Sequence, residues 1–143
     1  MTAQDTFKIQ DTISRFATSF DLKDWDGLRA CLVDSVFTDY TDLRGTPPST
    51  VNADEYVAAR RHSLEGTVSH HLAGNYEIAF VDAKDATCRA SMVIWRKAGE
   101  EQFTTHCVYL FRLEKTGAAW KISGITQKVL WNEGNPAIHP GAR

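Results

Sequence analysis

The first twenty residues carry apolar side chains three and four positions apart. This stripe consists of Ile9, Ile13, Phe16, Ala17 and Phe20. Positions at these spacings lie on one face of a helix, so the pattern predicts an amphipathic helix over about residues 5–20. Asp21 continues the same stripe, four residues after Ala17, which places a carboxylate at the end of the face that packs inward.

Two further helices are predicted before the hydrophobic period changes. Asp24 is placed to cap a short helix whose apolar side runs from Trp25 to Val33. A strand over 36–40 and a loop over 45–50, which contains two prolines, follow. Asn52 with Glu55 three residues later resembles a capping box and predicts a third helix through about residue 64.

From residue 67 the apolar positions recur every second residue, which is the period of a β-strand. Four strands are predicted over about 67–81, 86–97, 102–115 and 119–131, and turn signals separate them. Strands of this length in a small domain imply a strongly curved antiparallel sheet. Residues 132–143 contain two glycines and two prolines and are predicted to form an irregular tail.

The strand over 102–115 is apolar on both faces between residues 107 and 111. A strand with one face in water alternates apolar and polar side chains, so both faces of this strand should be covered. Three short helices cannot cover both faces of a sheet. We therefore expect a second copy of the chain to cover the other face, in a dimer or a trimer.

Composition and charge narrow the function. The 143 residues have the usual size of one domain, and 43% hydrophobic and 24% charged residues are typical of a globular protein. We expect one domain over 1–131, followed by the tail. The net charge is −2 and no basic stripe is present, so nucleic acid is not an expected partner. Charged residues interrupt the first twenty positions, so neither a signal peptide nor a membrane span is expected, and the protein should be cytoplasmic.

Histidines are the candidates for proton transfer, because a neutral imidazole accepts protons near pH 7. His70 and His71 are neighbours on a predicted strand, so they point to opposite faces and cannot both enter one pocket. His106 shares a strand face with Val108 and Leu110, an otherwise apolar surface. A single histidine in such a place is most often a core or rim residue bonded to a backbone carbonyl.

Other polar residues could converge with these histidines on one concavity. A carboxylate such as Asp21 on one ring nitrogen of a histidine fixes its tautomer and raises its pKa, and the pair is then a general base. Tyr40 could polarise a carbonyl oxygen, although most strand tyrosines are only packed. Arg60 or Arg61 should lean inward from the third helix and could hold an acidic group, the alternative being a surface arginine whose stem lies on the core.

Several chemistries lack the motifs that they need. The spacings His-x-His and His-Glu-x-x-His and the two-histidine-plus-carboxylate pattern are missing, so no metal is expected. The sequence also contains no nucleophile elbow, phosphate-binding glycine loop or dinucleotide fingerprint. Three widely spaced cysteines in apolar stretches favour buried thiols over disulfides. We therefore expect no cofactor and a small-molecule substrate.

Four segments carry a resemblance to a known family. They are FDLKDWDGL over 20–28, FTDY over 37–40, SHHLAGN over 69–75 and GAAWKI over 117–122. With the order of the elements, they resemble the nuclear-transport-factor-2-like family and, within it, the SnoaL-like group. The resemblance covers about residues 5–131 and implies an α+β fold, the cone-shaped, cystatin-like barrel in which three N-terminal helices pack on a strongly bent, mostly antiparallel sheet.

The resemblance also implies roles for individual residues. Asp21 and His71, the latter four residues before Asn75, look like the catalytic dyad of hexachlorocyclohexane dehydrochlorinase. Tyr40, His106 and Gln127 look like substrate-side positions of scytalone dehydratase. Gln127 replaces an asparagine there, and Phe20 stands where that enzyme has its other tyrosine.

We therefore expect a cofactor-independent lyase or dehydratase that acts on a small, partly apolar, aromatic or alicyclic molecule. His71 is the expected base and Asp21 orients it. The expected substrate-binding residues are Tyr40, His106, Gln127, Trp25 and Arg60. A cyclase or isomerase with the same base is one alternative. A non-catalytic ligand-binding or assembly module, like the small subunit of ring-hydroxylating dioxygenases, is another, and a gap above about 6 Å between Asp21 and His71 would favour it.

Overall fold

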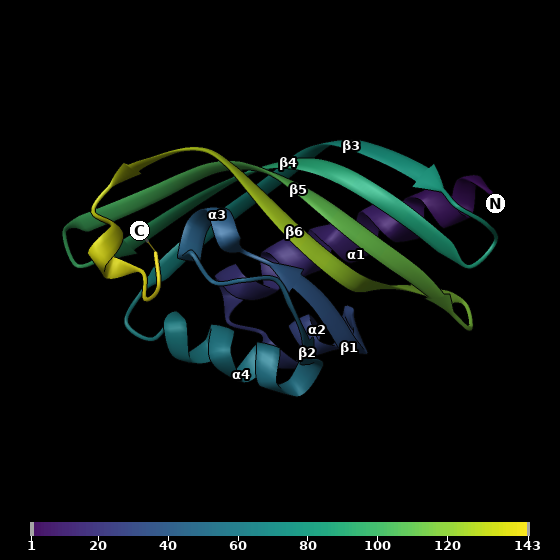
Figure 1. Cartoon of the computed structure of the whole chain (residues 1–143), viewed down its shortest axis with the longest axis horizontal. Coiled ribbons are helices and arrows are strands. Elements are labelled where there is room, and N and C mark those ends of the chain that lie inside the picture. Colours follow the sequence, from purple (N-terminus) through teal and green to yellow (C-terminus); the bar gives the residue numbers. More distant parts are fainter. Residues whose placement is uncertain (1, 143) are drawn as a thin grey trace.

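The computed structural model describes residues 2–142 and shows a layer of helices on one face of a curved sheet (Figure 1). The helices are α1 (Ala3–Leu22), α2 (Trp25–Ala30), α3 (Thr41–Arg44) and α4 (Ala53–Ser63). The strands are β1 (Leu32–Asp39), β2 (Ser49–Asn52), β3 (Val68–Phe80), β4 (Asp85–Ala98), β5 (Glu101–Thr116) and β6 (Ala119–Gly134), and a 3-10 helix, η1 (Pro136–Ile138), follows.

The sheet has the strand order β2-β1-β6-β5-β4-β3. The pair β1 and β6 is parallel, and every other neighbouring pair is antiparallel. The sheet curls around the helix layer without closing into a barrel. The expected α+β class, with helices on a bent and mostly antiparallel sheet, is confirmed.

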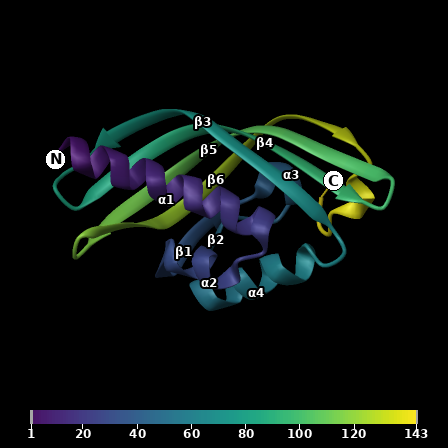
Figure 2. The same ribbon diagram turned by 180° about the vertical axis from the view of Figure 1, so that it is seen from behind.

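Helix α1 is held on the sheet by the apolar stripe that the sequence contains. Ile9, Ile13, Phe16 and Phe20 are at most 6% exposed, and burying each such side chain stabilises the fold by roughly 1.5–3 kcal/mol. Figure 2 shows α1 lying along the sheet, with α2 and α4 beyond its C-terminal end. The helix ends at Lys23, whose backbone is left-handed with φ 53°. This packing carries Asp21 to the inner side of the sheet.

The segment between α2 and α4 differs from the prediction. Strand β1 begins at Leu32, so Leu32 and Val33, which the sequence pattern assigns to the short helix, belong to the strand, whereas Trp25 and Leu28 are in α2 as predicted. A short helix, α3, precedes the predicted loop, and the end of that loop belongs to β2, which pairs with β1 through Thr38 and Ser49. The Asn52 side chain caps α4 by accepting from the backbone N–H groups of Asp54 and Glu55, as predicted.

The outer face of the sheet carries exposed apolar side chains. They include Leu72, Trp95, Leu110, Leu130 and Trp131, each at least 41% exposed. The helices described within residues 2–142 lie on the opposite face (Figures 1 and 2). The expected dimer or trimer stays a prediction. None of the helices in this part of the chain combines the length and apolar character that crossing a membrane requires.

Candidate active site

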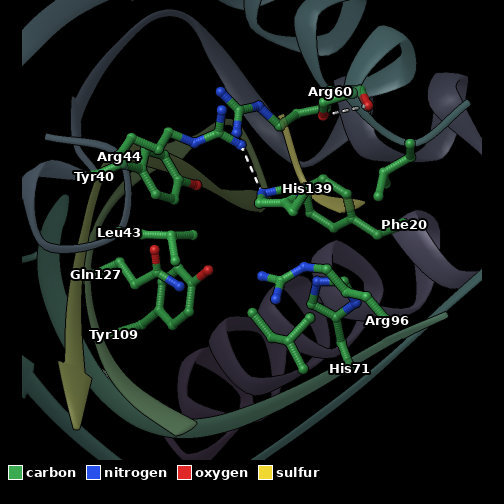
Figure 3. Close-up of a pocket in the computed structure, with 13 residues that line it drawn as sticks. Phe20, Tyr40, Leu43, Arg44, Arg60, His71, Arg96, Tyr109, Gln127 and His139 are labelled. Carbon is green, nitrogen blue, oxygen red and sulfur yellow. Dashed lines mark hydrogen bonds between the residues drawn. The ribbon is translucent and has the colours of Figure 1, made fainter. Parts of the chain in front are cut away.

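A cavity lies between the helix layer and the inner face of the sheet (Figure 3). Its lining comes from α1, α3, α4, from strands β3 to β6, and from the chain just after η1. The room inside it that a water-sized molecule can reach is about 40 Å³, and all the empty space between the lining residues, including open solvent at the mouth, is about 400 Å³.

The Asp21 carboxylate and the His71 imidazole are in direct contact. His71 Nδ1 lies 2.6 Å from Asp21 Oδ1, and the His71 backbone N–H donates to Oδ2 at 2.8 Å. The Ser69 hydroxyl also donates to Oδ1, at 3.2 Å. Because an ionised carboxylate only accepts hydrogen bonds, the neutral imidazole carries its hydrogen on Nδ1 and has a lone pair on Nε2.

Local structure explains how this contact forms. Asp21 is in the last turn of α1, where the helix dipole disfavours a negative charge, and the three donated hydrogen bonds offset that cost. Strand β3 is at the edge of the sheet, so alternate backbone N–H groups lack a strand partner. The backbone N–H of His71 is one of them, and it donates to the Asp21 carboxylate. Phe20 stacks on the imidazole with ring centroids 5.0 Å apart and restricts its rotation.

The pKa of His71 differs from the sequence-based prediction. Asp21 favours the imidazolium, as expected, but burial disfavours it more strongly and lowers the pKa below its ordinary value of 6.5. The positive charge of Arg96 acts in the same direction as burial. His71 is therefore neutral at pH 7, which is the form that accepts a proton.

Three of the predicted substrate-binding residues line the cavity: Tyr40, Arg60 and Gln127. The Tyr40 and Tyr56 hydroxyls are 2.7 Å apart and hydrogen-bonded. Of the two arginines on α4, Arg60 leans inward, with its guanidinium 5.1 Å from the Tyr40 ring centroid. Gln127 is 2% exposed, and its Oε1 has no hydrogen-bond partner within residues 2–142.

The other two predicted substrate-binding residues do not reach the cavity. His106 lies on the outer face of β5, where its ring stacks on Trp131 at 4.0 Å between centroids. Cys107 and Tyr109 are inward, and strand alternation therefore turns His106 outward. Trp25 packs edge-on against Phe20, 6.4 Å between centroids, outside the cavity lining.

The cavity also contains residues that the sequence-based prediction missed, namely Arg44, Arg96, Tyr109 and His139. Arg96 follows the buried Met92 and Ile94 at a spacing of two, a pattern that places it on the inner face of β4. His139 had no such signal, because residues 132–143 were assigned to an irregular tail. In the structure β6 continues to Gly134 and η1 follows, which brings His139 to the cavity.

Other groups offer less support for chemistry. Burial raises the pKa of each of the thiols of Cys31, Cys88 and Cys107 to about 11, so they stay protonated. A groove of about 560 Å³ beside α1 and α2 contains neither histidine nor tyrosine. Within residues 2–142 no group of three or more His, Cys, Asp or Glu side chains is arranged to hold a metal ion.

Comparisons with known proteins agree with this architecture. A scytalone dehydratase-like protein of Passalora fulva, claB, is 26% identical over 91% of this chain and 88% of its own length. The crystal structure of protein Kfla4162 from Kribbella flavida superposes with a TM-score of 0.88, at 24% identity, over 94% of this chain and 95% of that one. The crystal structure of hexachlorocyclohexane dehydrochlorinase LinA-type3 from Novosphingobium barchaimii superposes with a TM-score of 0.76, at 17% identity, over 94% of this chain and 92% of that one.

The two structural similarities, at these identities, show the fold alone. The family follows from a different finding. The model of the SnoaL-like domain matches residues 1–126, which is most of the chain and includes the helix layer, the Asp21–His71 contact and all strands but the end of β6. The chain therefore belongs to the SnoaL-like family.

Proposed function

We propose that the protein is a cofactor-independent lyase of the dehydratase kind, in which His71 is the general base. The observation that carries this proposal is the 2.6 Å contact between His71 Nδ1 and Asp21 Oδ1 at the cavity wall. It leaves Nε2 as the basic nitrogen. The SnoaL-like family and the dehydratase-like relatives support a reaction of the lyase or isomerase kind.

In the proposed reaction, Nε2 of His71 takes a proton from a carbon next to a carbonyl group of the substrate. The electron pair of that C–H bond forms a carbon–carbon double bond as the hydroxyl group on the neighbouring carbon departs. The imidazolium, stabilised by Asp21, returns its proton to the departing oxygen, which leaves as water. The substrate loses one molecule of water, and no oxidant or reductant is needed.

Neighbouring hydroxyl groups could stabilise the charge on the carbonyl oxygen during proton abstraction. Burial raises the pKa of Tyr56 and of Tyr109 well above 10, so both phenols keep their protons. Tyr109 lines the cavity, and Tyr56 is hydrogen-bonded to Tyr40 at its wall. A protonated phenol next to a developing oxyanion donates a hydrogen bond to it.

Two alternatives remain distinct from this reaction. A cyclase or isomerase would use the same proton abstraction and then close a ring or return the proton to another carbon. A binding or assembly module would not need the dyad, and the Asp21–His71 contact, far shorter than the 6 Å gap expected for such a module, favours an enzyme.

The test is deuterium exchange in D2O with a panel of small cyclic and aromatic β-hydroxy ketones. Proton NMR should show loss of the C–H signal next to the carbonyl, with formation of the unsaturated ketone. His71→Ala should reduce both rates at least a hundredfold. His70→Ala is the matched control, because His70 is exposed and stacks on Trp95, and its rate should stay within about threefold of the parent. Equal loss in both variants, or none in His71→Ala, would contradict the proposal.

We also propose that the outer face of the sheet joins copies of the chain into a dimer or trimer. The exposed side chains of Leu72, Trp95, Leu110, Leu130 and Trp131 support this. Soluble monomers rarely expose a contiguous apolar surface of large side chains, and closed symmetric oligomers bury such surfaces.

A further inference from the structure

Three arginines line the cavity without an acidic partner. Arg44, Arg60 and Arg96 come from α3, α4 and β4. Neither an aspartate nor a glutamate is part of the lining, and none of the three arginines takes part in an ion pair with a carboxylate of residues 2–142. The Asp21 carboxylate is engaged by His71 and Ser69. The cavity lining therefore carries three positive charges, and the Asp21 carboxylate behind His71 is the negative charge that the site sets against them.

The contacts of these guanidinium groups are with neutral partners. The Arg60 guanidinium lies over the rings of Tyr40 and Tyr56, at 5.1 and 5.0 Å. Arg96, 5% exposed, donates to the Thr105 hydroxyl at 2.8 Å. Arg44 donates to the backbone carbonyl of residue 140 at 3.3 Å. Such contacts hold the side chains in place but do not neutralise their charges.

Several buried donors at this cavity have no partner. The Nε atoms of Arg44 and Arg60 and Nδ1 of His139 are buried and make no hydrogen bond within residues 2–142. Arg44 Nη2 lies 3.1 Å from His139 Nε2. Since arginine can only donate, His139 accepts at Nε2 and carries its hydrogen on Nδ1. Buried donors without partners are uncommon, and they favour a bound group that accepts hydrogen bonds at this cavity.

The pKa values of Arg44, Arg96 and His139 reflect both burial and the positive charge around the cavity. Burial, together with the charge of Arg60, lowers the pKa of Arg44 to about 10, and burial lowers that of Arg96 to about 10. Burial and the three arginines lower the pKa of His139 to about 2, so its ring is neutral. An anion in the cavity would relieve this repulsion, whereas a neutral ligand would leave it in place.

We infer that the substrate of the proposed reaction carries a carboxylate, which binds among Arg44, Arg60 and Arg96 beside His139. Figure 3 shows Arg44 and Arg60 on one side of His139 and Arg96 with His71 on the other. The room that a water-sized molecule can reach, about 40 Å³, corresponds to about three or four water molecules at about 10–15 Å³ each, which is enough for a planar carboxylate. Guanidinium groups match that planar shape with paired N–H donors.

The inference deepens the proposed function, on which it rests, by naming the substrate class. A small aromatic or alicyclic acid would place its carboxylate among the arginines and its ring against Phe20, Leu43 and Ile94, which supply apolar lining. The charge would then orient the acidic C–H bond toward His71. Arg96, which affects the pKa of His71 through its charge, is the arginine that links the two parts of the site.

The experiment is calorimetric titration of the full chain with benzoate and with benzamide, a neutral molecule of the same shape. Benzoate should bind at a saturable site at least tenfold more tightly than benzamide. Arg60→Met and Arg96→Met should each weaken benzoate binding at least tenfold, and both keep an apolar stem of similar size. Arg61→Met, the exposed neighbour of Arg60, removes the same charge and should leave binding unchanged. Melting curves confirm that each variant is folded.

Three results would overturn the inference: equal binding of benzoate and benzamide, unchanged benzoate binding in folded Arg60→Met and Arg96→Met, or binding of inorganic phosphate in place of benzoate. The base variant His71→Gln separates this inference from the proposed function. It keeps the arginines, so benzoate binding should be retained while turnover is lost. Benzoate binding with no turnover of any β-hydroxy ketone, with or without a carboxylate, would refute the proposed reaction alone, and turnover of neutral ketones without benzoate binding would refute the carboxylate site alone.

Discussion

Replacing Asp21 with asparagine removes the charge of the carboxylate while keeping its shape. In the parent protein, Oδ2 accepts the backbone N–H of His71, and Oδ1 accepts from Nδ1 and from the Ser69 hydroxyl. Asparagine has only one oxygen for these donors. If that oxygen accepts the backbone N–H, its amide N–H faces Nδ1, and the imidazole must move its hydrogen to Nε2, which then cannot accept a proton.

The size of the effect follows from these contacts. If His71 keeps its hydrogen on Nδ1 in the Asp21→Asn variant, the charge-assisted hydrogen bond is lost, which costs about 1.5–3 kcal/mol. Donors left without acceptors cost about 1–3 kcal/mol more. Together these costs are roughly 2.5–6 kcal/mol, and each 1.4 kcal/mol is a factor of about ten in rate. We therefore expect kcat to decrease by a factor of about a hundred to ten thousand.

Two measurements check this prediction. The first is the rate of deuterium exchange at the carbon next to the carbonyl group, measured for the parent and for Asp21→Asn at pH 7.5. Nitrogen-15 NMR of the His71 ring reports the tautomer without any substrate, and it should show the hydrogen on Nδ1 in the parent and on Nε2 in the variant. Melting curves should show that the variant folds, because the side chain keeps its volume.

A folded Asp21→Asn protein that reacts within about tenfold of the parent would refute the reasoning, as would an unchanged Nδ1–H tautomer. In that case the carboxylate would have a structural role at the end of α1, and His71 would not depend on it for its protonation state.

Four other predictions follow from the structure. Because the pKa of His71 is lowered below 6.5, the reaction rate should stay level as the pH falls to 6.5 and decrease only below it, and a rate that halves near pH 7.5 would contradict this. The unfolded chain binds this proton at the ordinary pKa, so the free energy of unfolding should decrease as the pH falls below 6.5, and urea unfolding at pH 7.5 and 5.5 measures it. His106→Ala should keep kcat/KM within about threefold, since its ring lies on the outer face, and a tenfold loss would place it in the mechanism. Light scattering should find a particle of two or three times 16.0 kDa at micromolar concentration, and Leu110→Lys should dissociate it, whereas a parent particle of 16.0 kDa alone would contradict the proposed oligomer.

The secondary structure could be predicted closely from the sequence, because hydrophobic period is a local property. The spacing of Ile9, Ile13 and Phe16 predicts α1, and the change to a period of two at residue 67 predicts the start of β3 at Val68. Strand β2 could not be found in this way. Three of its four residues are polar and exposed, and the segment forms a strand because β1 lies beside it.

The dyad was accessible to sequence reasoning only in part. The stripe on α1 determines that Asp21 points inward, and alternation determines that only one of His70 and His71 shares its face. Alternation does not say which face a helix layer will cover. The resemblance to a family assigned His71, whereas the same reasoning assigned His106 to the cavity although it lies on the outer face.

The sequence by itself determined the long elements, their order and the inward position of Asp21, because these depend on neighbours within one helix or strand. Only the tertiary structure decided that Arg44, Arg60, Arg96 and His139 meet at one cavity. These residues are separated by 16 or more positions and come from different elements, so their convergence depends on the curvature of the sheet and on the return of the chain after β6. The direction of the His71 pKa shift could also be decided only from the structure. Burial lowers this pKa and outweighs the charge of Asp21, and burial is a property of the packed fold.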